Sequence, residues 1–192
     1  MKNHFLLTII TLLISVSCIY SQDSKNIIND SHTPLHLLKP DYEIPYAKLS
    51  ADQIKNKIDK VLSYLDLSTY TKVEDSNTHA IINDFKSINS SSQLKRGDFR
   101  IASYEWGVTY AAMLKAGNNA KDEKYFNYVK TRLDFLSEVT PYFKRVFTEG
   151  KSIDSQMGQI INPHALDDAG AVCASMINAG IQLSRIEKYK PM

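Results

Sequence analysis

The stretch PHALDDAGAVCASMINAG, residues 163–180, decides the fold class of this chain. Two adjacent carboxylates, Asp167 and Asp168, precede a run of small and apolar residues that carries no charge. Carboxylates favour the first turn of a helix because they accept bonds from its free N–H groups and face the positive end of its dipole. We therefore expect a helix that begins at Asp167 or Asp168 and runs to about Arg185. It should be buried on most sides, since its middle lacks charge.

The first helix of the chain is expected over residues 50–66. Ser50 and Gln53 form a capping box, in which each side chain bonds to the backbone N–H of the other residue. Apolar residues then recur at helical spacing and give this helix one apolar face. Residues 67–98 are expected to hold a Ser/Asn-rich loop, with a short helix around residues 78–86 and no convincing strand alternation.

Two more helices are expected over residues 103–116 and 122–138. Gly117, which two asparagines follow, should end the first of them, and Pro141 should end the second. The helices over 103–116 and 167–185 carry little charge, whereas the helix over 122–138 is charged on one face. This order of inner, outer and inner helices predicts an all-α fold, a double-layered toroid of antiparallel helical hairpins.

The N-terminus has the pattern of an export signal. A polar start precedes an apolar run too short to span a bilayer, so we expect a secretory signal peptide over residues 1–21, cleaved after Ser21. The alternative is a lipoprotein signal with lipid on Cys18. Residues 22–49, interrupted by three prolines, should form an N-terminal extension, and residues 50–192 the domain. The protein should be secreted or periplasmic, or an outer-membrane lipoprotein if Cys18 is lipidated.

Composition argues against several classes of partner. The formal net charge is +2 and the basic residues form no stripe interleaved with aromatics, so nucleic acid is not an expected partner. The five histidines are dispersed, which argues against a metal site, and no glycine-rich phosphate loop occurs, so no cofactor is expected. Cys173 lies in the alanine-rich helix and is expected to be a small, buried core residue.

Three stretches in combination resemble glycoside hydrolase families 88 and 105, the unsaturated glucuronyl and rhamnogalacturonyl hydrolases. They are RGDFRIASYEWGVTYAAMLKAG (residues 96–117), DEKYFNYVKTRLDFL (122–136) and PHALDDAGAVCASMI (163–177). The features that carry the resemblance are a Trp-Gly helix start, an Asp-x-x-Tyr-x-x-Tyr outer helix and an acid-x-Gly helix start. The resemblance covers about residues 95–179. It implies an (α/α)6 barrel with a pocket at one end, of which this chain is the N-terminal part.

The resemblance also implies a reaction. Enzymes of these families act on the products of polysaccharide lyases, whose terminal uronic acid has a C4=C5 double bond. They protonate this bond and let water add at C5, and the hemiketal then opens and releases the sugar. The families use two catalytic aspartates on different inner helices. Asp168 matches the one at the acid-x-Gly helix start, with Asp167 as the alternative if the register shifts by one, and the expected proton donor is the other aspartate. Trp106, His164 and Tyr104 are expected to bind the acidic oligosaccharide.

One part of the family pattern is missing. The second family aspartate lies in a later Trp-x-Asp segment, and this sequence has Trp106 as its only tryptophan. We therefore expect an N-terminal fragment that is inactive alone. The alternative is a non-catalytic, helical carbohydrate-binding protein or an inactive fragment of that fold. Each residue also has a purely structural alternative: Asp167 and Asp168 as helix caps, Trp106 as a core residue and His164 as the cap of a loop.

Overall fold

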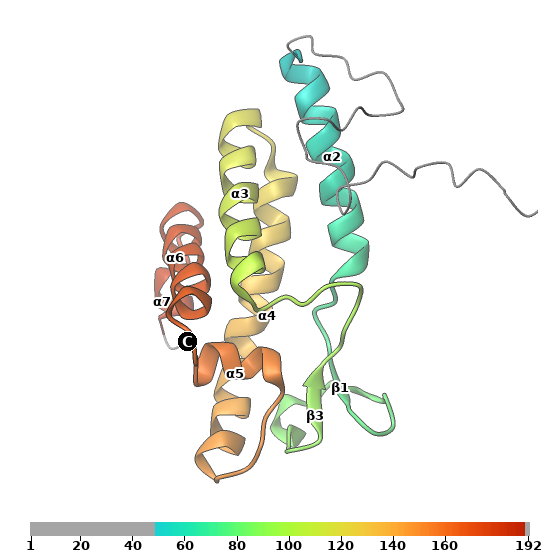
Figure 1. Ribbon diagram of the computed structural model, residues 1–192, viewed down its shortest axis with the longest axis vertical. Helices are drawn as coiled ribbons and strands as arrows, with labels where there is room; N and C mark the ends of the chain where they lie inside the picture. Colours follow the sequence, from blue (N-terminus) through green and yellow to red (C-terminus); the bar gives the residue numbers. More distant parts are fainter. Residues whose placement is uncertain (1–48, 191–192) are drawn as a thin grey trace, which may run out of the picture. The chain divides into compact units, whose positions relative to one another are not determined.

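The computed structural model describes residues 49–190 of the chain (Figure 1). The predicted signal peptide over residues 1–21, Cys18 within it, and the predicted extension up to residue 48 lie outside the described residues. The described part is mostly helical, as predicted, with a small sheet between its first two long helices. No helix in this part has the length and apolar character needed to cross a membrane.

Helix α2 (Ala51–Ser68) begins with the predicted capping box. The Ser50 hydroxyl accepts a hydrogen bond from the backbone N–H of Gln53, and the Gln53 side-chain oxygen accepts one from the backbone N–H of Ser50, at 3.2 and 2.9 Å. The two bonds satisfy N–H groups that the first turn of a helix otherwise leaves free. The predicted apolar face is buried only in part, because Ile54 and Val61 are exposed.

A three-stranded antiparallel sheet follows, where a loop and a short helix were predicted. Its strands are β1 (Val73–Asp75), β2 (Ile81–Ile82) and β3 (Ser92–Leu94), in the order β2-β1-β3, and a 3-10 turn spans Phe85–Ser87. The prediction that this region lacks strands was wrong, as was the helix over residues 78–86. Strands of two or three residues are too short to show the alternation by which a strand is recognised.

A single aspartate organises the turn between β1 and β2. The Asp75 carboxylate accepts hydrogen bonds from the backbone N–H groups of Asn77 and Thr78, at 3.0 and 2.9 Å. Asp side chains commonly accept such bonds in turns, where they compete with the backbone hydrogen bonds of a helix. His79 then takes a left-handed conformation with φ of 58°, which reverses the chain into β2.

Helix α3 (Tyr104–Ala120) is longer than predicted, because Gly117 does not end it. A Cβ atom at Gly117 would lie 2.8 Å from the Phe126 ring, so this glycine in the interior of α3 allows the close approach of the next helix, α4 (Glu123–Thr148). Helix α3 ends instead at Lys121, which takes a left-handed conformation with φ of 50°. The Ser103 hydroxyl caps its start and accepts a hydrogen bond from the backbone N–H of Trp106.

Helix α4 (Glu123–Thr148) runs through Pro141, which was predicted to end it. Proline removes one backbone hydrogen bond from a helix interior and disfavours continuation. Here the apolar stripe continues on the far side of the proline through residues that are buried in the core, so tertiary packing holds the helix together. These buried residues are Phe143 and Val146.

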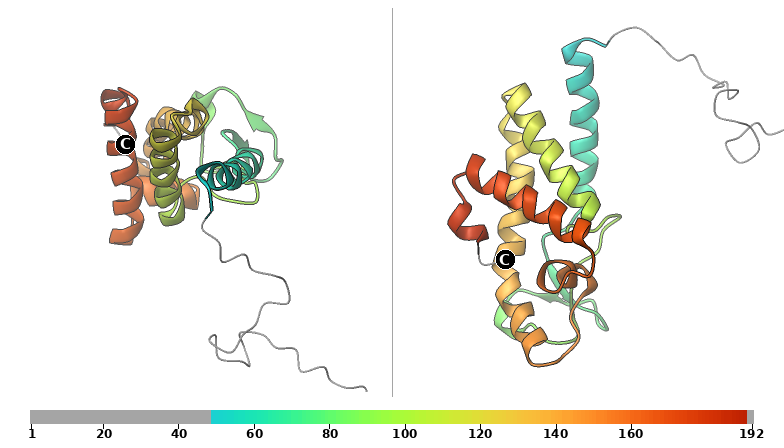
Figure 2. Two further views of the ribbon diagram at one scale, coloured as in Figure 1. Left: turned by 90° about the horizontal axis from the view of Figure 1, so that it is seen from above. Right: turned by 60° about the vertical axis from the view of Figure 1, so that its left-hand side comes forward.

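The C-terminal part of the described chain consists of helices α5 (Ser155–Ile161), α6 (Leu166–Gln182) and α7 (Ile186–Tyr189). Helices α3 and α6 pack side by side and run in the same direction (Figure 2). A Cβ atom at Gly107 would lie 2.4 Å from the Ala171 carbonyl carbon, and eleven residues further along each helix the Asn118 amide donates to the Gln182 side chain at 2.9 Å. The two helices are therefore parallel and in register.

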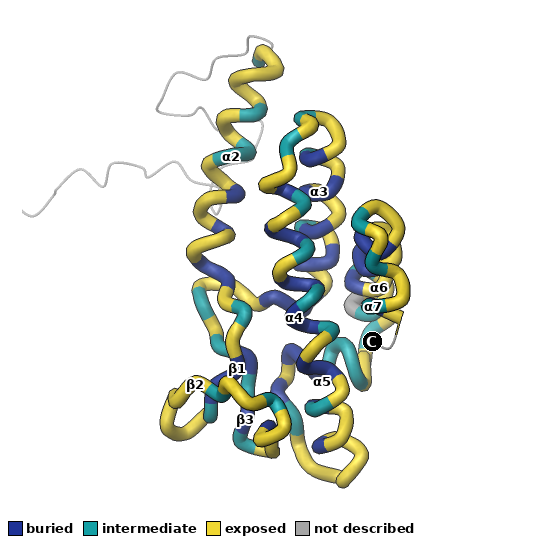
Figure 3. The backbone as a smooth tube through the Cα atoms, turned by 180° about the vertical axis from the view of Figure 1, so that it is seen from behind, coloured by how far each residue is buried: buried dark blue, intermediate teal, exposed yellow. Residues whose placement is uncertain are grey.

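The core lies chiefly between α3 and α4, and Figure 3 marks buried residues along both helices. The prediction that α3 and α6 are buried on most sides was wrong for the described part. Each helix keeps an exposed face of small and apolar residues: Val108, Ala111 and Ala112 on α3, and Gly170, Cys173, Ala174, Ile177 and Ile181 on α6. The prediction that Cys173 is buried was wrong for the same reason.

Candidate functional site

The parallel packing of α3 and α6 brings together the starts of the two helices that carry the predicted site. Trp106 is the third residue of α3 and Asp168 is the third residue of α6. Because the helices run in register from Gly107 and Ala171 onward, both first turns lie at the same end of the pair. This end of the α3–α6 pair is the candidate site.

The start of α6 differs from the predicted capping arrangement. The helix begins at Leu166, and its cap residue is Ala165, which has no side chain that can accept a hydrogen bond. Asp167 and Asp168 are the second and third helical residues, so neither is the cap residue. At these positions a carboxylate still interacts favourably with the helix dipole. The side chain of Asp167 is exposed, and the structure describes only the backbone of Asp168.

Trp106 lies in the core, with only 7% of its surface exposed. Its ring packs against Phe99 with centroids 5.2 Å apart, and Phe99 in turn meets Tyr64 of α2 edge to face, at 5.9 Å. The indole Nε1 is buried and has no hydrogen-bond partner among the described residues. In this conformation Trp106 supports Phe99 and does not itself present a ring face to solvent.

Phe99 and Tyr104 are exposed aromatic residues near the start of α3, and Tyr64 of α2, which contacts Phe99, is exposed as well. Tyr104 is the first residue of α3 and was predicted to bind substrate, whereas Phe99 was not singled out. The signal for Phe99 is Gly97, two residues before it: a Cβ atom there would lie 2.1 Å from the Ser68 carbonyl oxygen. Only glycine lets the chain pass so close to the end of α2 and bring Phe99 to Trp106.

The segment that leads into α3 is held from both sides at Ile101. The Gln156 side-chain oxygen accepts a hydrogen bond from the backbone N–H of Ile101 at 2.8 Å, and the Tyr110 hydroxyl donates to the Ile101 carbonyl at 2.7 Å. Both side chains are fully buried. These buried bonds fix the position of the residues just before the Ser103 cap and hence of the α3 start.

The charged groups at this end of the α3–α6 pair are exposed. A hydrogen bond with the Ser103 hydroxyl lowers the pKa of Glu105 below its usual value, so Glu105 is ionised at neutral pH and is poorly suited to donate a proton. His164 lies in the segment between α5 and α6, and its side chain is exposed. His164, Tyr104 and Asp167 are thus open to solvent, while Trp106 is not.

A buried carboxyl group lies elsewhere, at the start of α5. Burial raises the pKa of Asp154 above its usual value, and the carboxylate accepts a hydrogen bond from the backbone N–H of Leu94 at 3.4 Å. Asp154 therefore covers the outer edge of β3 and joins the sheet to α5. We assign it a role in holding these elements together and not in the candidate site.

Within the described residues no three His, Cys, Asp or Glu side chains are grouped so that they could hold a metal ion. No known protein family matches this sequence, and no curated protein sequence matches it either. The resemblance to glycoside hydrolase families 88 and 105 therefore remains a prediction from the quoted motifs.

Proposed function

We propose that residues 50–190 form one side of an (α/α)6 barrel that removes a terminal unsaturated uronic acid from the oligosaccharide products of polysaccharide lyases. The observation that supports this proposal is the parallel, in-register packing of α3 and α6, joined through the antiparallel α4. In such barrels consecutive inner helices run in the same direction and an outer helix returns the chain between them. In a simple up-and-down four-helix bundle, neighbouring helices are antiparallel and the parallel ones lie diagonally opposite, whereas α3 and α6 are parallel and in direct contact.

The exposed face shared by α3 and α6 supports the same proposal. The inner helices of a helical barrel cover one another around the axis, and small residues allow them to approach closely. Ala111 and Ala112 of α3 and Gly170 and Ala174 of α6 provide such a face, and it is exposed in the described part. In this proposal further inner helices complete the ring, and the pocket opens at the end where Tyr104 and Asp167 lie.

The chemistry assigned to the site needs an acid that reaches the C4=C5 double bond of the substrate. The resemblance places this proton donor in the later Trp-x-Asp segment. We place Asp168, with Asp167 as the alternative, as the carboxylate that raises the pKa of this acid and stabilises the developing cation, and we place Tyr104, Trp106 and His164 in substrate binding. A proton added at C4 leaves a cation at C5, which water captures, and the resulting hemiketal opens to release the sugar. Interaction with a second carboxylate would keep the acid protonated near neutral pH.

The test is an ultraviolet assay. Hydration removes the double bond and with it the absorbance of the conjugated uronate, so turnover of an unsaturated disaccharide can be followed directly. The assay is run on this chain and on the longest polypeptide that its gene encodes. Loss of absorbance with either protein, and with release of the neighbouring sugar, supports the proposal. The absence of turnover with both proteins overturns it.

One observation favours a second function, the non-catalytic binding of carbohydrate. Phe99 and Tyr104 expose aromatic rings beside the start of α3, and such rings can stack on the apolar face of a sugar. Binding of an unsaturated disaccharide that shifts the resonances of these two residues, without any change in its absorbance, would favour this function over hydrolysis.

A further inference from the structure

Three aromatic rings beside the candidate site pack in series from α2 to α3. The Trp106 ring packs against the Phe99 ring with centroids 5.2 Å apart and planes 31° apart, and the Tyr64 ring meets Phe99 edge to face at 5.9 Å. The exposed fraction falls along this series, from 54% for Tyr64 to 37% for Phe99 and 7% for Trp106. We call these three residues the aromatic stack. Phe99 therefore shields Trp106 from solvent on one side.

Trp106 is buried although its own polar atom is unsatisfied. The indole Nε1 has no hydrogen-bond acceptor among the described residues. A buried donor without an acceptor costs the desolvation of that group, and most such groups in native proteins have a partner. In this conformation the indole N–H is therefore a donor that an oxygen atom of a ligand can satisfy.

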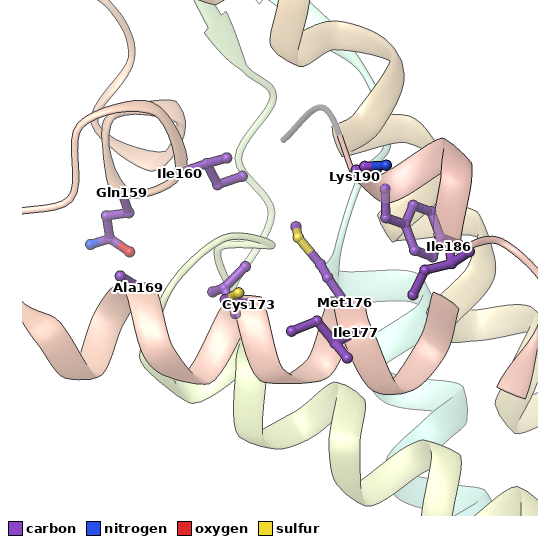
Figure 4. A pocket seen from close by; sticks show the side chains of 10 residues that line it. Gln159, Ile160, Ala169, Cys173, Met176, Ile177, Ile186 and Lys190 are labelled. Carbon is purple, nitrogen blue, oxygen red and sulfur yellow. The ribbon is translucent and has the colours of Figure 1, made fainter. Parts of the chain in front are cut away.

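The groove between α5, α6 and α7 does not lead to this donor. It has a volume of about 390 Å³, and Figure 4 shows side chains of all three helices around it, among them Gln159, Cys173 and Ile186. Trp106 is not one of its lining residues. A molecule bound in this groove would leave the indole N–H without an acceptor, whereas a molecule that enters from the side of Phe99 would meet the ring directly.

The segment that carries Phe99 is fixed at both ends and weakly held between them. At one end Gly97 passes the Ser68 carbonyl so closely that a Cβ atom would lie 2.1 Å away, and at the other end two buried hydrogen bonds hold Ile101. Between these points the Phe99 N–H donates to the Ser68 carbonyl at 3.5 Å, which is long for a hydrogen bond. Phe99 can therefore move while the ends of its segment stay in place.

The outer side of Phe99 is fastened by an exposed polar bond. The Tyr64 hydroxyl donates to the Asp98 carboxylate at 2.9 Å, and this bond ties the Tyr64 ring to the segment that carries Phe99. Water competes for a hydrogen bond at the surface, so its net contribution is modest. A ligand shifts an equilibrium only by the difference in its affinity for the two conformations, and a weakly held ring requires only a small difference.

We propose that Phe99 is a lid over Trp106 and that the acidic oligosaccharide displaces it on binding. In the closed conformation Phe99 lies against the indole ring. In the open conformation a sugar ring takes the place of Phe99, and one of its oxygen atoms accepts the hydrogen bond of the indole N–H. The proposal rests on the role in substrate binding proposed for Trp106, and it reconciles that role with the burial of the ring.

Trp106 is the only tryptophan of this chain, so its fluorescence reports the position of the lid. Tyr64→Phe keeps every ring and removes only the hydrogen bond to Asp98. It should shift the emission to longer wavelength and increase quenching by acrylamide, because the lid opens more often. Tyr142→Phe is the matched control, since the Tyr142 ring packs on Phe85 outside the aromatic stack, and it should leave both unchanged. Equal quenching of the two variants overturns the proposal.

Binding of an unsaturated disaccharide distinguishes a lid from a stacking surface. If Phe99 is a lid, Phe99→Ala removes a group that the sugar must displace, and the dissociation constant should fall roughly threefold to tenfold. If the sugar stacks on Phe99 itself, the constant rises instead. Phe147→Ala is the matched control, since Phe147 of α4 is 38% exposed, and it should leave the constant within about twofold. Calorimetry measures the constants in the longest polypeptide that the gene encodes, with Asp168→Asn in every protein to slow turnover.

These results are distinguishable from a failure of the proposed hydrolysis. A lower dissociation constant for Phe99→Ala supports the lid whether or not the unaltered protein removes the double bond. An unchanged or higher constant overturns the lid even where turnover occurs, and so does the absence of binding in every protein. If Phe99→Ala does not fold, Tyr64→Phe decides, because it should lower the constant in the same direction.

Discussion

Asp168 and Asp167 are chemically alike and lie next to each other, so paired substitutions can separate their roles. In the longest polypeptide that the gene encodes, Asp168→Asn should lower the rate of absorbance loss on an unsaturated disaccharide by roughly 10²- to 10⁴-fold, as expected for loss of an acid–base group. Asparagine keeps the size of the side chain, and the lost dipole interaction costs only about 0.3–1 kcal/mol of stability.

Asp167→Asn is the matched control and should keep near-normal turnover. If the two results are exchanged, the family register is shifted by one residue. If both variants are as active as the unaltered protein, the two carboxylates serve the helix start alone. Thermal unfolding of each variant shows whether a loss of rate reflects a loss of fold.

Arg132 of α4 is the buried charge on which the end of α2 depends. Its guanidinium group donates to the Thr69 carbonyl at 3.1 Å and the Asp66 carbonyl at 3.2 Å, bonds the Thr69 hydroxyl and lies 3.9 Å from the Tyr128 ring centroid. These bonds satisfy carbonyls that the last turn of a helix leaves free. Their geometry requires the planar, multivalent guanidinium group and not a single ammonium group.

Arg132→Lys should therefore lower the free energy of unfolding by roughly 2–4 kcal/mol, because it leaves buried carbonyls without donors. Urea unfolding measures this change. Lys130→Ala is the control, since Lys130 lies on the same helix and its partly exposed side chain makes only an ion pair with Asp134 at 3.6 Å, and it should change stability by less than about 0.5 kcal/mol. An equal effect of the two variants would contradict the assigned role of Arg132.

At the scale of elements, two glycines distinguish the packed and the open faces of the α3–α6 pair. Gly107 lies against the backbone of Ala171, where a Cβ atom would meet the carbonyl carbon at 2.4 Å, whereas a Cβ atom at Gly170 would meet nothing within 4 Å. Gly107→Ala should push the helices apart and destabilise the protein by roughly 1–3 kcal/mol. Gly170→Ala should stabilise it by up to about 1 kcal/mol, because alanine favours the helix. Urea unfolding of both variants measures these opposite signs, and the same sign for both would argue against the close parallel packing.

The ion-pair network between α2 and α4 predicts how the stability depends on pH. Asp59 receives the Lys124 and Lys55 ammonium groups at 2.8 and 3.0 Å and the Tyr125 hydroxyl, and the bond from Lys124 contributes most to lowering its pKa below the ordinary 3.8. A lowered folded-state pKa stabilises the protein above the unfolded pKa, and this stabilisation is lost as the pH falls below about 3.8.

Asp59→Asn should consequently flatten the fall in stability below this pH, and added salt should reduce the difference between the two proteins because the groups are partly exposed. Thermal unfolding measured in steps from neutral to acidic pH provides the comparison. An acid transition that is identical in both proteins would show that other carboxylates cause it.

Several elements could be predicted from the sequence because their signals are local. The capping box at Ser50 and the apolar stripes each lie within one helix, so neighbouring residues suffice to recognise them. The continuation of α4 through Pro141 could not be predicted, since the residues that hold it are distant in sequence and meet only in the core. The same limit applies to β1, which is paired on both sides with other short strands.

The candidate site, too, could be predicted from the sequence only in part. The common end of α3 and α6 could be inferred, because the order inner, outer, inner makes the two inner helices parallel. The burial of Trp106 could not, because it depends on Phe99, and Phe99 reaches it only where Gly97 crosses the end of α2. The exposed faces of α3 and α6 could not be predicted either, because both helices lack charge in their middle and the sequence therefore indicated burial on most sides.

The open face of α3 and α6 provides a test of the whole-molecule proposal that does not require the catalytic residues. If further inner helices cover this face in a complete barrel, a charge placed on it must be tolerated by this chain and not by the complete domain. Ala174 lies on the exposed side of α6, so Ala174→Glu should change the unfolding free energy of this chain by no more than about 0.5 kcal/mol. In the longest polypeptide that the gene encodes, the same carboxylate would be buried without a partner and should destabilise the fold by several kcal/mol.

Asn127→Glu, on an exposed position of α4, is the control and should be tolerated in both proteins. Tolerance of Ala174→Glu in both proteins would show that this face stays in solvent, and would favour the helical carbohydrate-binding function over the barrel.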